Sequence, residues 1–251
     1  MNGLYKLYIN KYCKLDYFAV VTLPNYIRPF PTPLISIMAF PCVNHHIGFK
    51  HPFTCITIGP TMAGKTQYIA NLIKHRDRVI VPNVSRVVYS YKKYQPIFDT
   101  MEGVEFMQGL PTLDKSVPTL LIIDDQMNEC SPEIAELFTV GAHHDNCSII
   151  FVSQVMFFQD KVYRTACQNA TYLILFRSPR SQSQVGHLAR QMFSRPKGMV
   201  EAFEDATAQP YTNLVVDCRP DTPECLRLRT NILPSEGMAF QGVHLAHAYR
   251  V

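Results

Sequence analysis

The sequence lacks any C-x-x-C pair, although it contains eight cysteines. Cysteines paired at that spacing are a common sign of a zinc site, and an even set in a short secreted chain indicates a disulfide framework. Several of these cysteines instead fall inside segments that we expect to form buried strands. We therefore expect reduced, buried thiols in a protein that works inside a cell.

The sequence also lacks a secretory signal and an unbroken apolar span. Residues 1–16 mix lysines and one aspartate with aromatic residues and do not lead into an apolar block. The uncharged stretch 29–49 is long enough to cross a membrane, but its four prolines and two histidines speak against a continuous spanning helix. We predict an irregular N-terminal extension over residues 1–50 and no membrane partner.

Charged residues are scarce. They make up 18% of the chain, whereas 47% of the residues are hydrophobic, which is typical of a globular protein and not of a disordered one. A length of 251 residues suits one large domain with appendages, which we place at residues 51–233, followed by a C-terminal tail over 234–251. The formal net charge of +4 suits a polyanionic partner.

The segment CITIGPTMAGKTQYI, residues 55–69, runs from an apolar strand into a loop with two glycines. Its spacing G-x-x-x-x-G-K-T matches the phosphate-binding loop, in which backbone N–H groups and the lysine surround a chain of phosphates. A strand predicted over 53–58 and a helix over 67–75 give the loop its required context. The pattern predicts that a nucleoside triphosphate binds to Gly59, Pro60, Thr61, Met62, Ala63, Gly64, Lys65 and Thr66.

The segment TLLIIDDQM, residues 119–127, places two carboxylates directly after residues that suit a strand buried on both faces. In a phosphate-loop protein the first such carboxylate usually holds Mg²⁺ beside the loop hydroxyl, so we expect Asp124 and Thr66 to be the metal ligands. Asp125 is placed to polarise an attacking water, although many hydrolytic motors have a glutamate there. The alternative is that the two carboxylates cap the following helix.

Strands and helices alternate along the rest of the chain. We predict further strands over 86–91, 104–107, 147–154, 170–176 and 212–217, and helices over 132–140, 182–193 and 197–206. This alternation predicts an α/β fold, a three-layer P-loop NTPase sandwich with a mostly parallel central sheet. Ligands of such sheets bind at the carboxyl ends of the strands, where Gly64, Asp124, Asp125 and Gln154 all fall.

Gln154 ends one of these buried strands. An amide in that position can sense a γ-phosphate or orient a water molecule, and the alternative is an ordinary turn residue. The absence of N-K-x-D speaks against a GTPase, and the absence of an L-S-G-G-Q-type signature speaks against a transporter ATPase. A small-molecule kinase stays open, with Arg177 and Arg180 as lid arginines, but the two carboxylates and Gln154 favour water as the acceptor. His143 and His144 are expected to be structural residues and not metal ligands.

Five segments carry a resemblance to a known family: GPTMAGKT, LLIIDDQM, GAHHDNCSIIFVSQ, YLILFRSPRSQSQVGHLARQMF and MVEAFEDATAQPYTNLVVD. They occur in the order seen in the genome-packaging ATPases of Maverick/Polinton-type elements and related large DNA viruses, which belong to the FtsK–HerA group of motors. The resemblance covers about residues 52–233, most of the chain. It implies a Mg²⁺-dependent ATPase that pumps double-stranded DNA into a preformed capsid, as a homo-oligomeric ring with a capsid or portal-site protein as partner.

The same resemblance implies Asp125 as the catalytic carboxylate and Gln154 as the sensor. Such rings also need an arginine that reaches a neighbour's nucleotide. Arg164 is our first candidate and Arg180 the second, and each fits equally well as a surface or DNA-facing cation. The expected location is inside the host cell, in the nucleus or cytoplasm at the site of virus assembly. Two alternatives stay open: a small-molecule phosphotransferase, and an ATP-binding scaffold that does not hydrolyse ATP.

Overall fold

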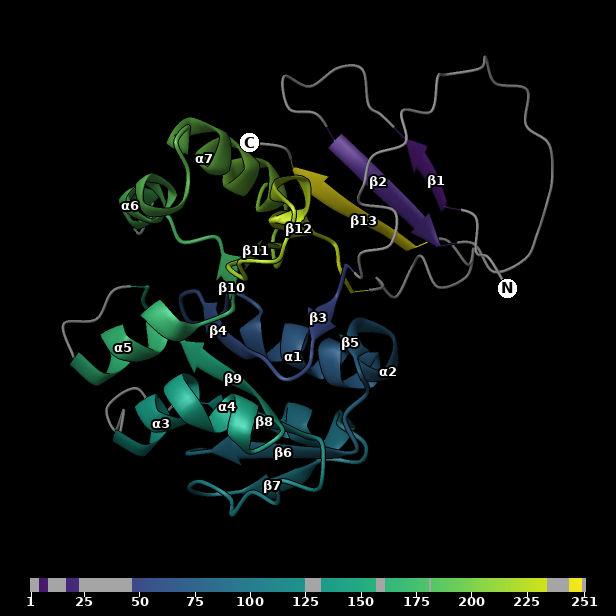
Figure 1. Cartoon of the computed structure of the whole chain (residues 1–251), viewed down its shortest axis with the longest axis vertical. Coiled ribbons are helices and arrows are strands. Elements are labelled where there is room, and N and C mark those ends of the chain that lie inside the picture. The colour runs from purple at the N-terminus through teal and green to yellow at the C-terminus, as the bar shows by residue number, and fades with distance from the viewer. Residues whose placement is uncertain are drawn as a thin grey trace.

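An eleven-stranded sheet runs through the whole molecule (Figure 1). Its strands lie in the order β1-β2-β13-β12-β11-β10-β4-β9-β8-β6-β7. A second, two-stranded sheet pairs β3 (Phe49–Lys50) with β5 (Ile80–Val81). The structure, a computed structural model, describes residues 5–8, 17–22, 47–124, 132–156, 161–180, 182–233 and 244–249.

Six neighbouring strands on one side of the large sheet are parallel. They are β10 (Tyr172–Phe176), β4 (Thr54–Ile58), β9 (Cys147–Ser153), β8 (Thr119–Asp124), β6 (Arg86–Tyr91) and β7 (Glu105–Met107). Every residue of β10, β4, β9 and β8 is buried. Parallel strands read as continuous apolar runs because helices cover both of their faces. The predicted α/β sandwich with a mostly parallel central sheet is therefore confirmed.

Helices cover the two faces of this sheet unequally. One face carries α1 (Lys65–Lys74), α2 (Arg76–Val79) and the 3₁₀ turn η1 (Pro96–Thr100). The other face carries α3 (Pro132–Glu136), α4 (Ala142–His144), α5 (Lys161–Asn169), α6 (Gln182–Met192) and α7 (Pro196–Ala206). The π-helical turn η3 (Leu137–Gly141) joins α3 to α4, so the helix predicted over 132–140 is longer and irregular. In the described ranges, no helix is long and apolar enough to cross a membrane.

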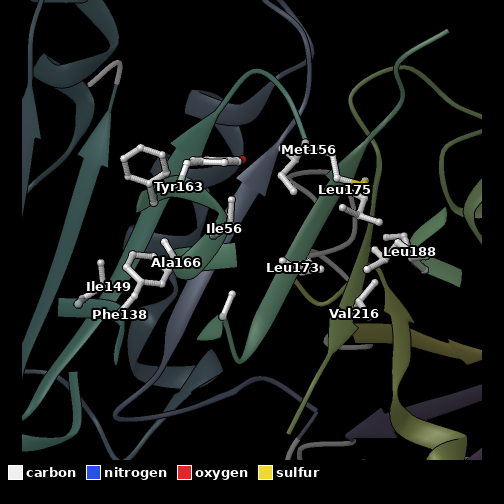
Figure 2. Close-up of a cluster of buried hydrophobic side chains, with 14 of the residues drawn as sticks. Ile56, Phe138, Ile149, Met156, Tyr163, Ala166, Leu173, Leu175, Leu188 and Val216 are labelled. Atoms are coloured by element: carbon white, nitrogen blue, oxygen red, sulfur yellow. The ribbon is translucent and has the colours of Figure 1, made fainter. Parts of the chain in front are cut away.

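The alternation of side chains along each strand divides the core into two layers. In β4, Ile56 and Ile58 pack on the side of α3 to α7, whereas Cys55 packs with Ile69 and Leu72 of α1. Figure 2 shows the first layer, in which Phe138 and Ile149 lie at one end of the cluster. Leu188 of α6 and Val216 of the sheet lie at its other end. The strand that leads into the phosphate-binding loop is thus fixed from both sides.

Beyond β10 the sheet becomes antiparallel. The helices α6 and α7 carry the chain along the sheet and back, so β11 (Asn213–Asp217) starts at the edge where β10 ends, with Asn213 opposite Phe176. The strands β12 (Leu228–Thr230), β13 (His244–Tyr249), β2 (Tyr17–Thr22) and β1 (Tyr5–Tyr8) extend this half. The sequence predicted β11 but neither its direction nor β12 and β13. The division at residues 50 and 233 stays a prediction, and the pairing of β12 with β13 crosses its second boundary.

A buried ionic cluster ties the segment before β3 to β11 and β12. The Asp217 carboxylate accepts hydrogen bonds from Arg229 Nη2 at 2.6 Å and from Arg219 Nη2 at 2.7 Å. The guanidinium of Arg229 also donates to the carbonyl oxygens of Ile47 and Gly48. Burial lowers the pKa of Arg229, and Asp217 opposes that effect. The cluster therefore anchors the segment that enters β3 and β4.

Candidate nucleotide-binding site

The carboxyl ends of the parallel strands gather the predicted site residues at one edge of the sheet. Ile58 at the end of β4 lies opposite Ser153 of β9, and Ile123 of β8 lies opposite Phe151 of β9. The strand β9 thus separates β4 from β8. The loop 59–66, Gln154 and Asp124 follow or end these three neighbouring strands, as the sequence predicted.

Gly59 makes the sharp exit from β4 sterically feasible. A Cβ atom on this residue would lie 2.7 Å from Phe176 Cβ and 3.3 Å from Ala63 Cβ. The first distance is shorter than carbon atoms tolerate, and Phe176 Cβ cannot move without its strand. The Gly59 N–H donates to the Ser153 carbonyl oxygen at 3.2 Å, which fixes the start of the loop against β9. Only glycine fits this position.

The remainder of the loop brings the chain to the N-terminus of α1. Gly64 precedes the helix with φ +92°, a conformation that favours glycine. The helix has no side-chain cap at its N-terminus and no acidic residue in its first turn. The positive end of its dipole is thus not offset by a carboxylate of its own first turn. A helix N-terminus of this kind attracts phosphate.

Lys65 folds back over the loop. Its Nζ donates to the carbonyl oxygens of Gly59 at 2.7 Å and Pro60 at 2.8 Å. These contacts hold the ammonium group at the turn, where a phosphate chain in the loop would meet it. Thr66 follows in the first turn of α1 and is partly buried. A cation and a hydroxyl therefore stand at the same end of the helix.

Asp124 is a buried carboxylate at the tip of β8. Leu120 and Ile122 of the same strand pack on the α1 side, so alternation puts Asp124 on that side as well. Its Oδ2 accepts a hydrogen bond of 2.7 Å from the hydroxyl of Tyr89, a fully buried residue of β6. Burial, with the Asp124 charge as a second cause, raises the pKa of Tyr89, so the phenol stays a neutral donor.

Sequence reasoning missed Tyr89. The residue looks like any aromatic residue of a buried strand, and its hydrogen bond to Asp124 becomes apparent only when β6 and β8 lie side by side.

Gln154 lies one residue beyond β9 and is exposed. The residues on both sides of it are held by α5, because the Tyr163 hydroxyl lies 2.8 Å from Ser153 Oγ and donates to the Val155 carbonyl oxygen at 2.6 Å. Gln154 also lines a small pocket together with Gly59 of the loop. The structure therefore places Gln154 next to the loop 59–66 and fixes the residues on both sides of it.

The remaining predicted site residues are exposed or lie outside the described part of the chain. Arg164 is exposed on α5, one residue after the buried Tyr163, and Arg180 is exposed in the turn after β10. Asp125 and the side chain of His143 lie outside the described residues. The roles of these residues stay predictions.

Comparisons with known proteins find distant similarities. No protein-family model matches the chain, and no curated protein matches it. Several solved structures are similar to it, and three of them are described below.

The genome packaging NTPase B204 of Sulfolobus turreted icosahedral virus 2, in complex with ATP-gammaS, is 14% identical with a TM-score of 0.43, over 68% of this chain and 95% of that one. The DNA-packaging ATPase B204 of Sulfolobus turreted icosahedral virus is 15% identical with a TM-score of 0.43, over 67% and 93% of the two chains. The Legionella pneumophila ATPase DotB is 13% identical with a TM-score of 0.32, over 83% and 70%.

The fit of Gly59 against Phe176 generates a prediction about stability. We expect Gly59→Ala to lower the free energy of unfolding by about 1–3 kcal/mol, because the added methyl group forces the loop or β10 to shift. Gly186→Ala is the matched control, since a Cβ there meets no atom closer than Arg190 Nη1 at 3.8 Å in the middle of α6. The control is expected to raise stability by about 0.5–1 kcal/mol. Urea unfolding of both variants measures the difference, and equal effects would contradict the steric account.

Proposed function

We propose that this chain is a Mg²⁺-dependent ATPase that hydrolyses ATP at the carboxyl edge of its parallel sheet. The observation that carries the proposal is the meeting of two groups at one edge. The loop 59–66, with Lys65 held against its carbonyls, leaves the strand β4, and the buried carboxylate of Asp124 ends β8. Only β9 separates the two strands.

The loop fits a triphosphate on three counts. Phe176 lies where a Cβ of residue 59 would point, so this residue has to be a glycine. The backbone at Gly59 therefore carries no side chain that would keep a phosphate away. The N-terminus of α1 offers its dipole without a carboxylate in the first turn. Lys65 supplies a positive charge that can move from the loop carbonyls to the phosphates. Together these groups would bind and orient the phosphate chain.

Thr66 and Asp124 are the residues that would hold Mg²⁺. A hydroxyl and a carboxylate are hard oxygen donors, and Mg²⁺ is usually bound by one or two carboxylates together with the phosphates of its nucleotide. When bound, the ion neutralises charge that develops on those phosphates. Tyr89 orients the carboxylate through its 2.7 Å hydrogen bond to Oδ2, so the metal site would be fixed before the nucleotide arrives.

Gln154 and Asp125 are the residues that we assign to the attacking water. Gln154 is exposed and lines a small pocket together with Gly59, so it lies beside the place where a phosphate chain would bind. Asp125 follows Asp124 directly in the sequence, and its assignment as the catalytic carboxylate rests on that position and on the family resemblance. The amide would orient the water, and the carboxylate would accept its proton.

We extend the proposal to a double-stranded DNA translocase that packages a viral or virus-like genome into a capsid. The support is the order of the five sequence segments that resemble packaging ATPases, together with a formal net charge of +4. The proposal includes a homo-oligomeric ring, a capsid or portal-site partner and a location at the virus assembly site within the host cell. Contacts to DNA would be mostly to phosphates and therefore independent of base sequence.

Arg164 is the residue that we propose to act on the nucleotide of a neighbouring subunit, with Arg180 as the second candidate. The same helix carries Tyr163, which holds the residues on both sides of Gln154. A shift of Gln154 at one site would therefore move α5 and the exposed Arg164 with it. This gives a physical route from one nucleotide site to the next.

Turnover with and without duplex DNA tests the proposed activity. We expect Lys65→Ala to abolish ATP hydrolysis and to weaken ATP binding, because the phosphates lose their principal side-chain cation. Lys74→Ala in the last turn of the same helix is the matched control and should keep full turnover. Duplex DNA should stimulate the wild type, and the stimulation should fall steeply between about 50 and 200 mM salt through counterion release.

Each alternative has its own outcome in this assay. Turnover that needs an added small-molecule acceptor and ignores DNA would identify a phosphotransferase. ATP binding without turnover under every condition would identify a scaffold. Full turnover by Lys65→Ala would show that the loop 59–66 is not the site of ATP hydrolysis.

Mixing two inactive variants tests the shared site. We expect Arg164→Ala to keep ATP binding but to lose turnover by a factor of about 10³–10⁵, as for arginine fingers elsewhere. Mixed with Lys65→Ala, it should regain part of the activity, because some interfaces then pair an intact loop with an intact arginine. Arg180→Ala, tested in parallel, identifies the finger if Arg164→Ala has normal turnover. Failure of both arginine variants to lose activity would contradict a site completed by a neighbour.

A further inference from the structure

Tyr211 has an unusual backbone conformation and an unusual exposure. Four non-glycine residues in the described part of the chain have a positive φ, namely Met62, Asn146, Tyr211 and Asn231. Asparagine tolerates this conformation, whereas a bulky side chain does so rarely. Tyr211 has φ +65° and 71% of its surface is exposed. Residues with strain of this kind cluster at active sites, ligand clamps and switch regions.

The turn that holds Tyr211 explains how the strain is kept. Pro210 precedes it, and its ring fixes φ near −65°. In a turn with proline at the second position and a positive φ at the third, the third residue is normally glycine or asparagine. Thr212 Oγ1 donates to the Gln209 carbonyl oxygen at 2.7 Å and closes the turn. An aromatic side chain is thus presented to solvent from a position that suits a small residue.

The position of the turn places Tyr211 at the phosphate-binding loop. Because β11 starts beside the end of β10, the residues before Asn213 lie at the carboxyl edge of the sheet. A Cβ atom on Gly64 would lie 3.0 Å from Tyr211 Cδ1 and 3.2 Å from Tyr211 Cβ. The tyrosine therefore contacts the residue that directly precedes Lys65 and α1.

We propose that Tyr211 is the platform on which the base of the bound nucleotide stacks, an inference that rests on the proposed function. The ring is exposed, aromatic and in contact with the loop that would hold the phosphates. Every base has a π-face, and stacking on an aromatic side chain needs no hydrogen-bond pattern. Met62 adds a second exposed apolar side chain, 88% accessible, on the loop itself. Its flexible thioether is suited to close against a stacked ring.

Equilibrium binding of ATP and of inorganic tripolyphosphate, each with Mg²⁺, tests this role. Tyr211→Asn suits a positive φ, so we expect it to keep or raise the melting temperature. It should weaken ATP binding by about 5- to 100-fold, because the base loses its stacking partner. Binding of tripolyphosphate, which has no base, should be unchanged. Tyr211→Phe should bind ATP as the wild type does.

The other outcomes separate this inference from the proposal on which it rests. If Lys65→Ala binds ATP normally, the phosphate site itself is wrong. If Lys65→Ala weakens both ligands but Tyr211→Asn binds ATP like the wild type, only the stacking role is overturned. A loss of DNA stimulation in Tyr211→Asn with unchanged ATP affinity would make the residue a DNA contact and would also overturn it. A lower melting temperature with weaker binding of both ligands would show a purely structural role.

Discussion

The strand β4 has a parallel neighbour on each side and is buried on both faces, so the chain can leave the sheet only at the carboxyl end of the strand. Phe176 of β10 then stands where the first side chain would point. The chain must therefore turn at a glycine and reach α1 within a few residues. This constraint shapes the loop, fixes the N-terminus of α1 beside the sheet and holds Lys65 against its own loop carbonyls.

The same edge collects groups from distant parts of the chain. Parallel neighbours end where β4 ends, so β9 and β8 bring Gln154 and Asp124 to the loop. The paired helices α6 and α7 return the chain to this edge as well, and β11 starts there. A single helix in that connection would have started the next strand at the opposite edge. Tyr211 would then have been far from Gly64.

The sequence predicted the parts of the site that depend on local pattern. The glycine spacing around Lys65 and the apolar run before Asp124 are features of short segments, and each produced the expected element. Residues that act through pairing could not be predicted in this way. Tyr89 reaches Asp124 of the neighbouring strand, although the two residues are 35 positions apart in the chain.

Other elements were not predicted because their sequence patterns are weak. Only Tyr163 and Ala166 are buried in α5, so its sequence shows little helical periodicity of apolar residues. The strand β12 has only three residues, too few for a recognisable pattern. The direction of β11 was equally hidden, because its residues are all buried and resemble a parallel strand. The position of Tyr211 beside Gly64 depends on that direction, and no local sequence pattern predicted it.

The central claim is that the loop and the carboxylate of Asp124 act on one ligand. The most direct measurement is the affinity for ATP, by titration calorimetry, with Mg²⁺ and with the metal chelated, for the wild type and for Asp124→Asn. The account predicts that Mg²⁺ tightens ATP binding to the wild type, and that the variant loses this gain while it keeps its metal-free affinity. An equal gain from Mg²⁺ in both proteins would contradict the account, because the carboxylate would then stand outside the nucleotide site.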